Sequence, residues 1–126
     1  MKTKATPIAI LFLSALLILA GIEALGAKGP TDEATRLLEK ADACKKSLLA
    51  SPARKKLRQN WMDCIRLYER AYGADVKSDQ APLAMYQAAK LYSDLYAYSR
   101  SPDDLDRAVE LYGRMAETYP GHRLAD

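Results

Sequence analysis

The pattern of hydrophobic and polar positions along the chain predicts helices and no sheet. Apolar side chains recur every three or four residues in four stripes, over 34–48, 57–72, 83–95 and 105–119. This spacing places the apolar residues on one face of a helix. No segment alternates with the period of two that a half-buried strand requires. We therefore expect an all-α domain built from four helices.

The residues between the stripes are typical of helix ends. Thr31 precedes two acidic residues, which the N-terminus of a helix favours. Ser51-Pro52 is expected to end the first helix and to open the second, which Gly73 closes. Ser101-Pro102, followed by two aspartates, marks the start of the last helix, and Pro120-Gly121 stops it.

The second and fourth predicted helices repeat each other. A shift of 44 residues lays residues 64–70 over 108–114, and Ala81 falls on Ala125. Such internal similarity indicates a stacked repeat array rather than a closed bundle. Since Ala81 opens the third helix, Ala125 is expected to open a fifth. Without that helix the apolar face of the last hairpin stays open, so we expect either a fragment or another chain that covers this face.

Within each unit the residues resemble the tetratricopeptide repeat. Small, aromatic and helix-stopping residues stand at its characteristic positions, namely Ala89, Tyr92, Ala108, Tyr112 and Pro120. The chain departs from the repeat in two ways: extra residues over 98–104 separate the two helices of the unit, and Val76 stands where a proline is expected. The resemblance implies two antiparallel helical hairpins, stacked as a tetratricopeptide-like array.

The first residues are typical of a secretory signal peptide. Lys2 and Lys4 form a cationic start, and a hydrophobic run over 8–22 leads to small residues before Ala27. Cleavage before Ala27 gives a signal-peptide helix, 1–26, and a helical domain, 27–126. The run is shorter than the ~20 apolar residues of a typical transmembrane helix, and an uncleaved anchor is the alternative. We expect export to the periplasm or cell envelope, with membrane contact only through this segment.

Two cysteines in an exported chain raise the question of a disulfide. Cys44 and Cys64 lie at apolar positions of helices that are expected to meet in a tight turn at Ser51-Pro52. Counting outward from that turn places Cys44 about 7 Å along the axis from Cys64. Since this offset is too large for easy bridging, we expect two buried small apolar residues, and a disulfide is the alternative.

Charge and residue content argue against several classes of function. The chain has nineteen Lys and Arg against sixteen Asp and Glu, a balance that is not typical of a nucleic-acid-binding protein. The single histidine, His122, cannot build a catalytic triad or a zinc site, and is interpreted as a loop residue. Asp103, Asp104 and Asp106 are interpreted as helix-capping residues rather than metal ligands. We therefore assign this chain no catalytic residue, no metal site and no cofactor.

Two groups of residues are candidates for binding. The first is a basic cluster near the first turn, from which we select Arg54, Lys55, Lys56 and Arg58. Cations in the first turn of a helix oppose the helix dipole, so an anionic membrane surface or wall polymer would account for them. An ordinary solvated helix end accounts for them too, and is the commoner cause of such a cluster.

The second candidate group is the pair Tyr96 and Tyr98, near the end of the third helix. An exposed tyrosine ring can stack on a sugar or hold a peptide. Packing against the fourth helix is the interpretation that we favour, with one of the two rings partly exposed.

From about Leu38 to Asp126 the chain is similar to the helical region that precedes the catalytic domain in some bacterial N-acetylmuramoyl-L-alanine amidases. The matching residues are mostly packing and capping positions: residues 54–58, Asn60-Trp61, residues 81–84, Tyr86, Ala88-Ala89, Leu91-Tyr92, residues 104–106, Ala108, Tyr119-Pro120 and residues 123–126. In that family a signal peptide comes first, and a zinc hydrolase domain follows the helical region.

The resemblance implies a non-catalytic N-terminal module of an exported amidase. Zinc would belong to the absent catalytic domain, and no catalytic residue of the family carries over to this chain. The module would bind an envelope protein or a peptidoglycan component and so position the enzyme. The alternative is a stand-alone envelope scaffold of tetratricopeptide-like repeats that mediates protein–protein interaction.

Overall fold

A computed structural model describes residues 29–125, and within this part the chain is all-helical and has no strand. The elements are α1 (Pro30–Leu49), α2 (Pro52–Lys55), α3 (Arg58–Ala74), α4 (Gln80–Ser99) and α5 (Pro102–Thr118). The all-α class predicted from the sequence is therefore confirmed. The predicted signal peptide, 1–26, lies outside the described residues.

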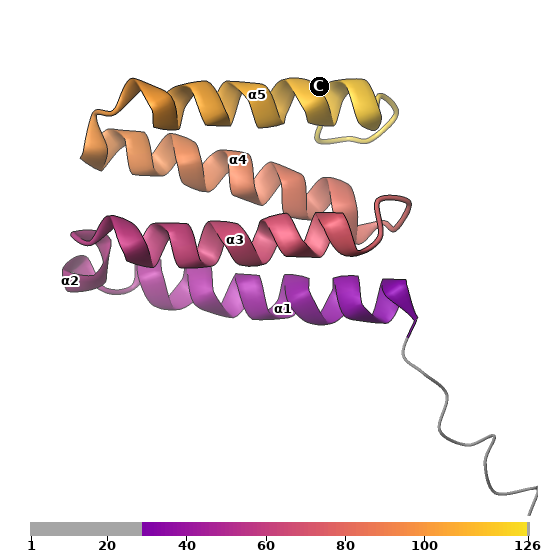
Figure 1. Cartoon of the computed structure of the whole chain (residues 1–126), viewed down its shortest axis with the longest axis horizontal. Coiled ribbons are helices and arrows are strands. Elements are labelled where there is room, and N and C mark those ends of the chain that lie inside the picture. Colours follow the sequence, from indigo (N-terminus) through magenta and orange to yellow (C-terminus); the bar gives the residue numbers. More distant parts are fainter. Residues whose placement is uncertain (1–28, 126) are drawn as a thin grey trace, which may run out of the picture.

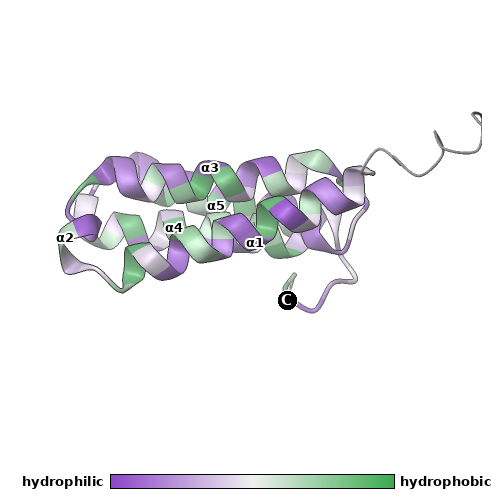
Figure 2. Cartoon of the chain, turned by 90° about the horizontal axis from the view of Figure 1, so that it is seen from below, coloured by the Kyte–Doolittle hydropathy of each residue, from purple (hydrophilic) through white to green (hydrophobic). Residues whose placement is uncertain are grey.

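The four long helices lie side by side in chain order (Figure 1). α1 packs against α3, α3 against α4, and α4 against α5, while α1 also reaches α4. Each of these helices carries both hydrophobic and hydrophilic residues, as expected for amphipathic helices that pack through one face (Figure 2). The largest fully buried side chains are Trp61, Tyr68, Leu48, Ile65, Leu91, Leu95, Leu111 and Met115.

The connection between α1 and α3 differs from the tight turn that we predicted. Ser51 caps a helix as expected, and its hydroxyl accepts a hydrogen bond from the Arg54 amide. That helix, α2, ends after one turn, and α3 begins at Arg58. The side chains of Asn60 and Trp61 donate hydrogen bonds to backbone carbonyls of Arg54 and Lys55, which holds the short helix against α3.

Cys44 and Cys64 form a disulfide, with 5.4 Å between their Cα atoms, so the expectation of two unbridged cysteines was wrong. The prediction failed because it assumed a tight turn between the two helices, whereas α2 lies between them. Cys44 lies five residues before the end of α1 at Leu49, and residue 63 lies five residues after the start of α3 at Arg58. The inserted α2 thus moves the register of the hairpin until the two cysteines lie level.

The predicted 44-residue repeat is present in the structure. α3 and α5 each contain 17 residues, and their bounds differ by that shift. The turns that follow them also match: the Ser78 amide donates to the Asp75 carbonyl, and the His122 amide to the Tyr119 carbonyl. The architecture is therefore helical and repeat-like.

The stretch 98–104, which we interpreted as extra residues between two helices, is almost entirely helical. Only Arg100 and Ser101 separate α4 from α5. Arg100 turns the chain in the left-handed conformation (φ 52°), and its amide donates to the Tyr96 carbonyl. The extra residues therefore lengthen the helices and leave the second connection short.

Candidate binding surface at one end of the helices

The candidate residues gather at the end of the molecule where α2 lies (Figure 1). This end is formed by α2, the C-termini of α1 and α4, and the N-termini of α3 and α5. We call the residues Arg54, Lys55, Lys56, Leu57 and Tyr98 the basic end. Within it, Leu57 is 62% exposed and Tyr98 is 56% exposed, so apolar and aromatic surface lies among the cations.

Lys55 and Tyr98, which we selected as members of separate groups, meet at this end. The Lys55 ammonium lies 5.9 Å from the centroid of the Tyr98 ring, a cation–π distance. The ring of Trp61 also neighbours the Tyr98 ring, with 5.4 Å between the two centroids. Trp61 also donates a hydrogen bond to the Lys55 carbonyl at 2.8 Å. The buried Trp61 thus positions both Lys55 and Tyr98. From the sequence we had predicted Trp61 only as a core residue.

The other two cations of the basic end, Arg54 and Lys56, differ in their contacts with the rest of the fold. Arg54 donates a hydrogen bond to the Ser47 hydroxyl at 2.7 Å, which ties α2 back to α1. Lys56, the C-terminal cap residue of α2, is exposed. A ligand at this end would therefore meet a cation held over an aromatic ring at Lys55 and a solvated cation at Lys56.

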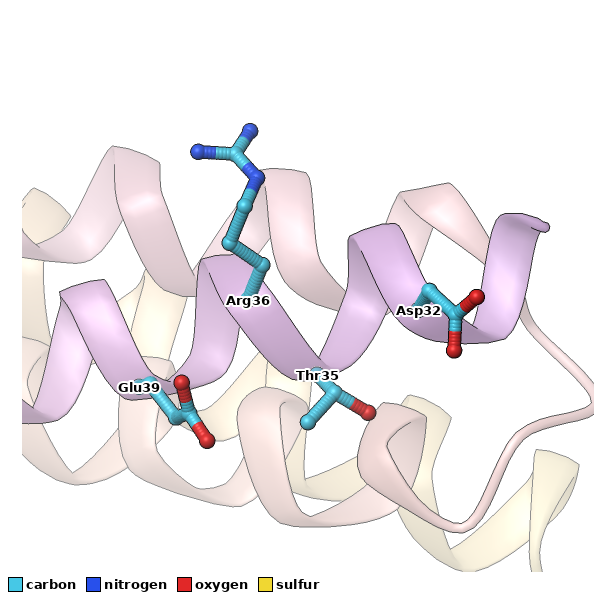
Figure 3. A pocket seen from close by; sticks show the side chains of 4 residues that line it. All are labelled: Asp32, Thr35, Arg36 and Glu39. Carbon is cyan, nitrogen blue, oxygen red and sulfur yellow. The ribbon is translucent and has the colours of Figure 1, made fainter. Parts of the chain in front are cut away.

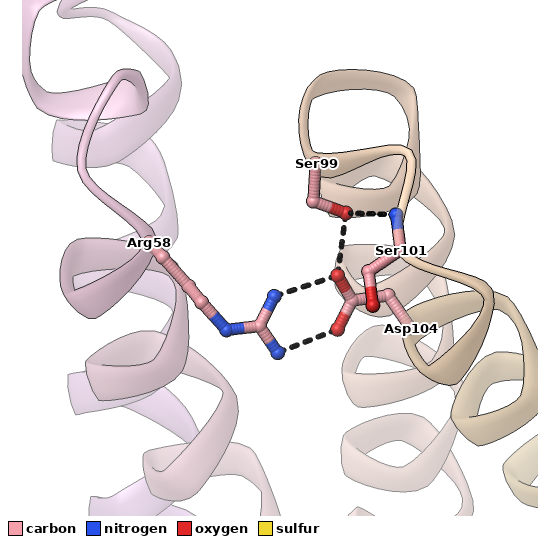
Figure 4. Close-up of polar contacts among 4 residues, drawn as sticks. All are labelled: Arg58, Ser99, Ser101 and Asp104. Carbon is pink, nitrogen blue, oxygen red and sulfur yellow. Dashed lines mark hydrogen bonds and ion pairs between the residues drawn. The ribbon is translucent and has the colours of Figure 1, made fainter.

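Arg58, a candidate binding residue, is engaged within the fold. Its guanidinium donates two hydrogen bonds of 2.6 Å to the carboxylate of Asp104, which is 1% exposed (Figure 4). The Ser99 hydroxyl donates a third to the same carboxylate, and the Ser101 amide donates to Ser99. Asp104, which we interpreted as a capping residue, instead joins the start of α5 to the start of α3.

This ion pair lowers the pKa of Asp104. The hydrogen bonds from Arg58 are the largest cause, and burial of the carboxyl acts in the opposite direction. Because the Arg58 side chain is still about half exposed, its charge remains part of the surface. Arg58 therefore contributes to the field of the basic end without a freely mobile guanidinium.

Tyr96 and Tyr98 do not form one site. Tyr96 is half-buried, whereas Tyr98 is exposed. Two residues apart on a helix, their side chains point in nearly opposite directions. This agrees with the expectation that one of the two rings is partly exposed, and that ring is Tyr98. We expected packing against the fourth predicted helix, α5, but the Tyr98 ring contacts Trp61 of α3 and Lys55 of α2.

A hollow on the surface of α1 is a weaker candidate. Asp32, Thr35, Arg36 and Glu39 line it, all from this one helix (Figure 3). The Arg36 side chain extends away from the other three and pairs with Glu33. A hollow along a single helix lacks the converging walls that a small-molecule site requires.

Within residues 29–125, no group of three or more His, Cys, Asp or Glu side chains is arranged to hold a metal ion. The imidazole of His122 accepts a hydrogen bond from the Leu124 amide, in the turn after α5. None of the helices in the described part is long and apolar enough to cross a membrane.

Comparison with known protein families, with curated proteins and with solved structures finds no match to this chain.

Proposed function

We propose that this chain is a non-catalytic binding module of the cell envelope and forms the N-terminal part of an exported N-acetylmuramoyl-L-alanine amidase. The observation that carries the binding role is the basic end, where Lys55 lies over the exposed ring of Tyr98 and next to the exposed Lys56. The sequence resemblance described above supports the link to the amidases. The module would hold the enzyme at its substrate.

The arrangement of the helices supports a tetratricopeptide-like array. In such an array each helix packs on its chain neighbours, and the first helices of successive units also meet. The contacts of α1 with α3, α3 with α4, α4 with α5 and α1 with α4 follow this order. The Cys44–Cys64 disulfide supports export, because disulfides persist in oxidising compartments.

The chemistry of the basic end fits an anionic, sugar-containing polymer of the cell wall. Ammonium groups attract carboxylate or phosphate, and an exposed tyrosine ring offers a flat surface to a sugar. The fit is to an extended polymer surface, since Leu57 and Tyr98 are more than half exposed and Lys56 is exposed beside them.

Cosedimentation with purified peptidoglycan tests this proposal. The variant Lys55→Glu/Lys56→Glu reverses two charges at the basic end, and Lys40→Glu/Lys77→Glu makes the same charge change at exposed positions elsewhere. We expect the first variant to lower the bound fraction about tenfold or more at low salt, and the control to lower it much less. Equal losses from both variants would show only a general charge effect and would contradict the proposal.

The alternative is a stand-alone envelope scaffold that binds proteins through its repeats. Hydrolysis of peptidoglycan in the presence of zinc separates the two. We expect this chain to release no muramic acid-linked product, and a protein extended through the downstream coding sequence to release it. If the extended protein is inactive, or if only further repeats follow, the amidase assignment fails and the scaffold replaces it.

A further inference from the structure

The basic end is assembled from two parts of the chain that lie far apart in the sequence. Residues 54–57 belong to α2 and the connection after it, and Tyr98 belongs to the end of α4. The Lys55 ammonium stays over the Tyr98 ring only while these two parts keep a fixed position relative to each other. The contacts that hold them together therefore decide whether the cation and the ring form one surface.

A hydrogen-bonded network next to the basic end joins the same two parts. Arg58 follows Leu57 in the chain, and Ser99 follows Tyr98. Both side chains donate to the carboxylate of Asp104, Arg58 through two hydrogen bonds of 2.6 Å and Ser99 through one of 2.6 Å. Asp104 thus accepts hydrogen bonds from the residue next to each half of the basic end (Figure 4).

The geometry of this network restricts motion on both sides of Asp104. Two parallel hydrogen bonds from a planar guanidinium fix the orientation of the partners as well as their distance. The Ser101 amide donates to the Ser99 hydroxyl at 3.1 Å, so the hydroxyl hydrogen is directed at the carboxylate. Asp104 itself is 1% exposed and lies in the first turn of α5.

Trp61 transmits this constraint to the ring of Tyr98. Trp61 lies about one turn after Arg58 on α3, donates to the Lys55 carbonyl, and packs against the Tyr98 ring. A displacement of the start of α3 relative to α5 would therefore move Trp61 and Lys55 away from Tyr98. The bonds of Asp104 to Arg58 and Ser99 oppose this displacement.

We infer that Asp104 is the positioning residue of the basic end, a buried carboxylate that raises the affinity of this cationic surface for an anionic polymer. Asp104 acts through Arg58 and Ser99 and does not touch the ligand, because its side chain is buried. The inference rests on the proposed function. It adds the group that keeps Lys55 and Tyr98 together as one site.

Charge alone leads to the opposite expectation for Asp104. An acid near the cations of the basic end lowers the positive potential that attracts an anion, so its removal should strengthen polymer binding. If Asp104 holds the two parts together, its removal should weaken binding, because the polymer then has to order Lys55 and Tyr98 when it binds. The two effects differ in sign.

Cosedimentation with purified peptidoglycan at low salt determines this sign. We expect Asp104→Asn to lower the affinity about threefold or more, although it removes an acid. Asp103→Asn is the matched control, since it removes the same charge from the same turn of α5 at an exposed position. The control should leave the affinity equal to that of the natural protein or slightly higher.

Ser99→Ala tests the same network without a change of charge. It removes one of the three hydrogen bonds to Asp104 at an exposed position, so the variant should fold. We expect weaker binding, and recovery in Ser99→Thr, which keeps a hydroxyl. Ala34→Gly controls for a loss of stability, because glycine destabilises a helix and Ala34 lies near the other end of α1. It should bind like the natural protein.

The fluorescence of Trp61 reports the position of Tyr98, because Trp61 is the single tryptophan of the chain. Acrylamide, a small neutral quencher, should quench Trp61 more strongly in Asp104→Asn and Ser99→Ala than in the natural protein. The change should be toward the value of Tyr98→Ala, in which the ring is absent. Asp103→Asn should show the natural value, and circular dichroism checks that each variant is folded.

Binding of Asp104→Asn that equals or exceeds that of the natural protein overturns the inference. So does weaker binding with unchanged quenching of Trp61, because Tyr98 would then have kept its place. If the natural protein does not bind peptidoglycan, the proposed function fails. The quenching result alone then decides whether Asp104 positions Tyr98.

Discussion

At the scale of single residues, the contact between Arg58 and Asp104 joins two units of the fold. The Asp104 carboxylate is buried, while Arg58 remains about half exposed to water. The two partners therefore differ in what their loss leaves behind. Removal of the acid leaves a cation that water can solvate, whereas removal of the cation leaves a buried charge with only hydroxyl support from Ser99.

We expect Arg58→Ala to destabilise the fold by about 3 kcal/mol and Asp104→Asn by about 1–2 kcal/mol, as measured by urea unfolding near neutral pH. The double variant should be more stable than Arg58→Ala alone, because the uncompensated carboxylate is gone. Equal effects of the two single variants would contradict this asymmetry.

The same pair predicts a pH dependence. In the natural protein Arg58 lowers the pKa of Asp104. The ionised Asp104 therefore stabilises the fold above the pKa of an unfolded aspartate, about 3.9. This stabilisation is lost as the pH falls through the lower pKa of the folded state. In Arg58→Ala, burial without the cation should raise that pKa. Arg58→Ala should be less stable than the natural protein at neutral pH, and this difference in unfolding free energy should become smaller as the pH falls toward about 5. A constant difference across this range would refute the assignment.

At the scale of elements, α2 determines the pairing of α1 with α3. It inserts a short helix between them, and this insertion brings Cys44 level with Cys64. The disulfide then closes a loop with a sequence separation of 20 that contains α2 and Lys55. The bond therefore also fixes the part of the chain that presents the basic end.

Replacing both cysteines by alanine is expected to lower the unfolding free energy by about 3 kcal/mol, through the greater freedom of the unfolded chain. For a domain of this size the Tm should fall by roughly 10–20 °C. A reducing agent should lower the Tm of the natural protein by a similar amount and leave that of Cys44→Ala/Cys64→Ala unchanged. Insensitivity of the natural protein to reduction would show that the bond is absent.

At the scale of the whole molecule, the basic end gathers residues from helices that are far apart in the sequence. Lys55 lies in α2, Arg58 begins α3 and Tyr98 lies near the end of α4. These elements meet at the end of the molecule where α2 connects α1 to α3 (Figure 1).

The features that could be predicted from the sequence are those that depend on near neighbours in the chain. Periodicity over three and four residues gave the long helices, Ser101-Pro102 gave the start of α5, and the 44-residue shift gave the match of α5 with α3. The meeting of Lys55 with Tyr98, the bidentate partner of Arg58 and the Cys44–Cys64 bond were decided by tertiary structure. Each joins residues on different helices, so it depends on how far one helix is displaced along another. That displacement was set by α2, whose end after a single turn is stabilised by side chains of α3 that hydrogen-bond its carbonyls.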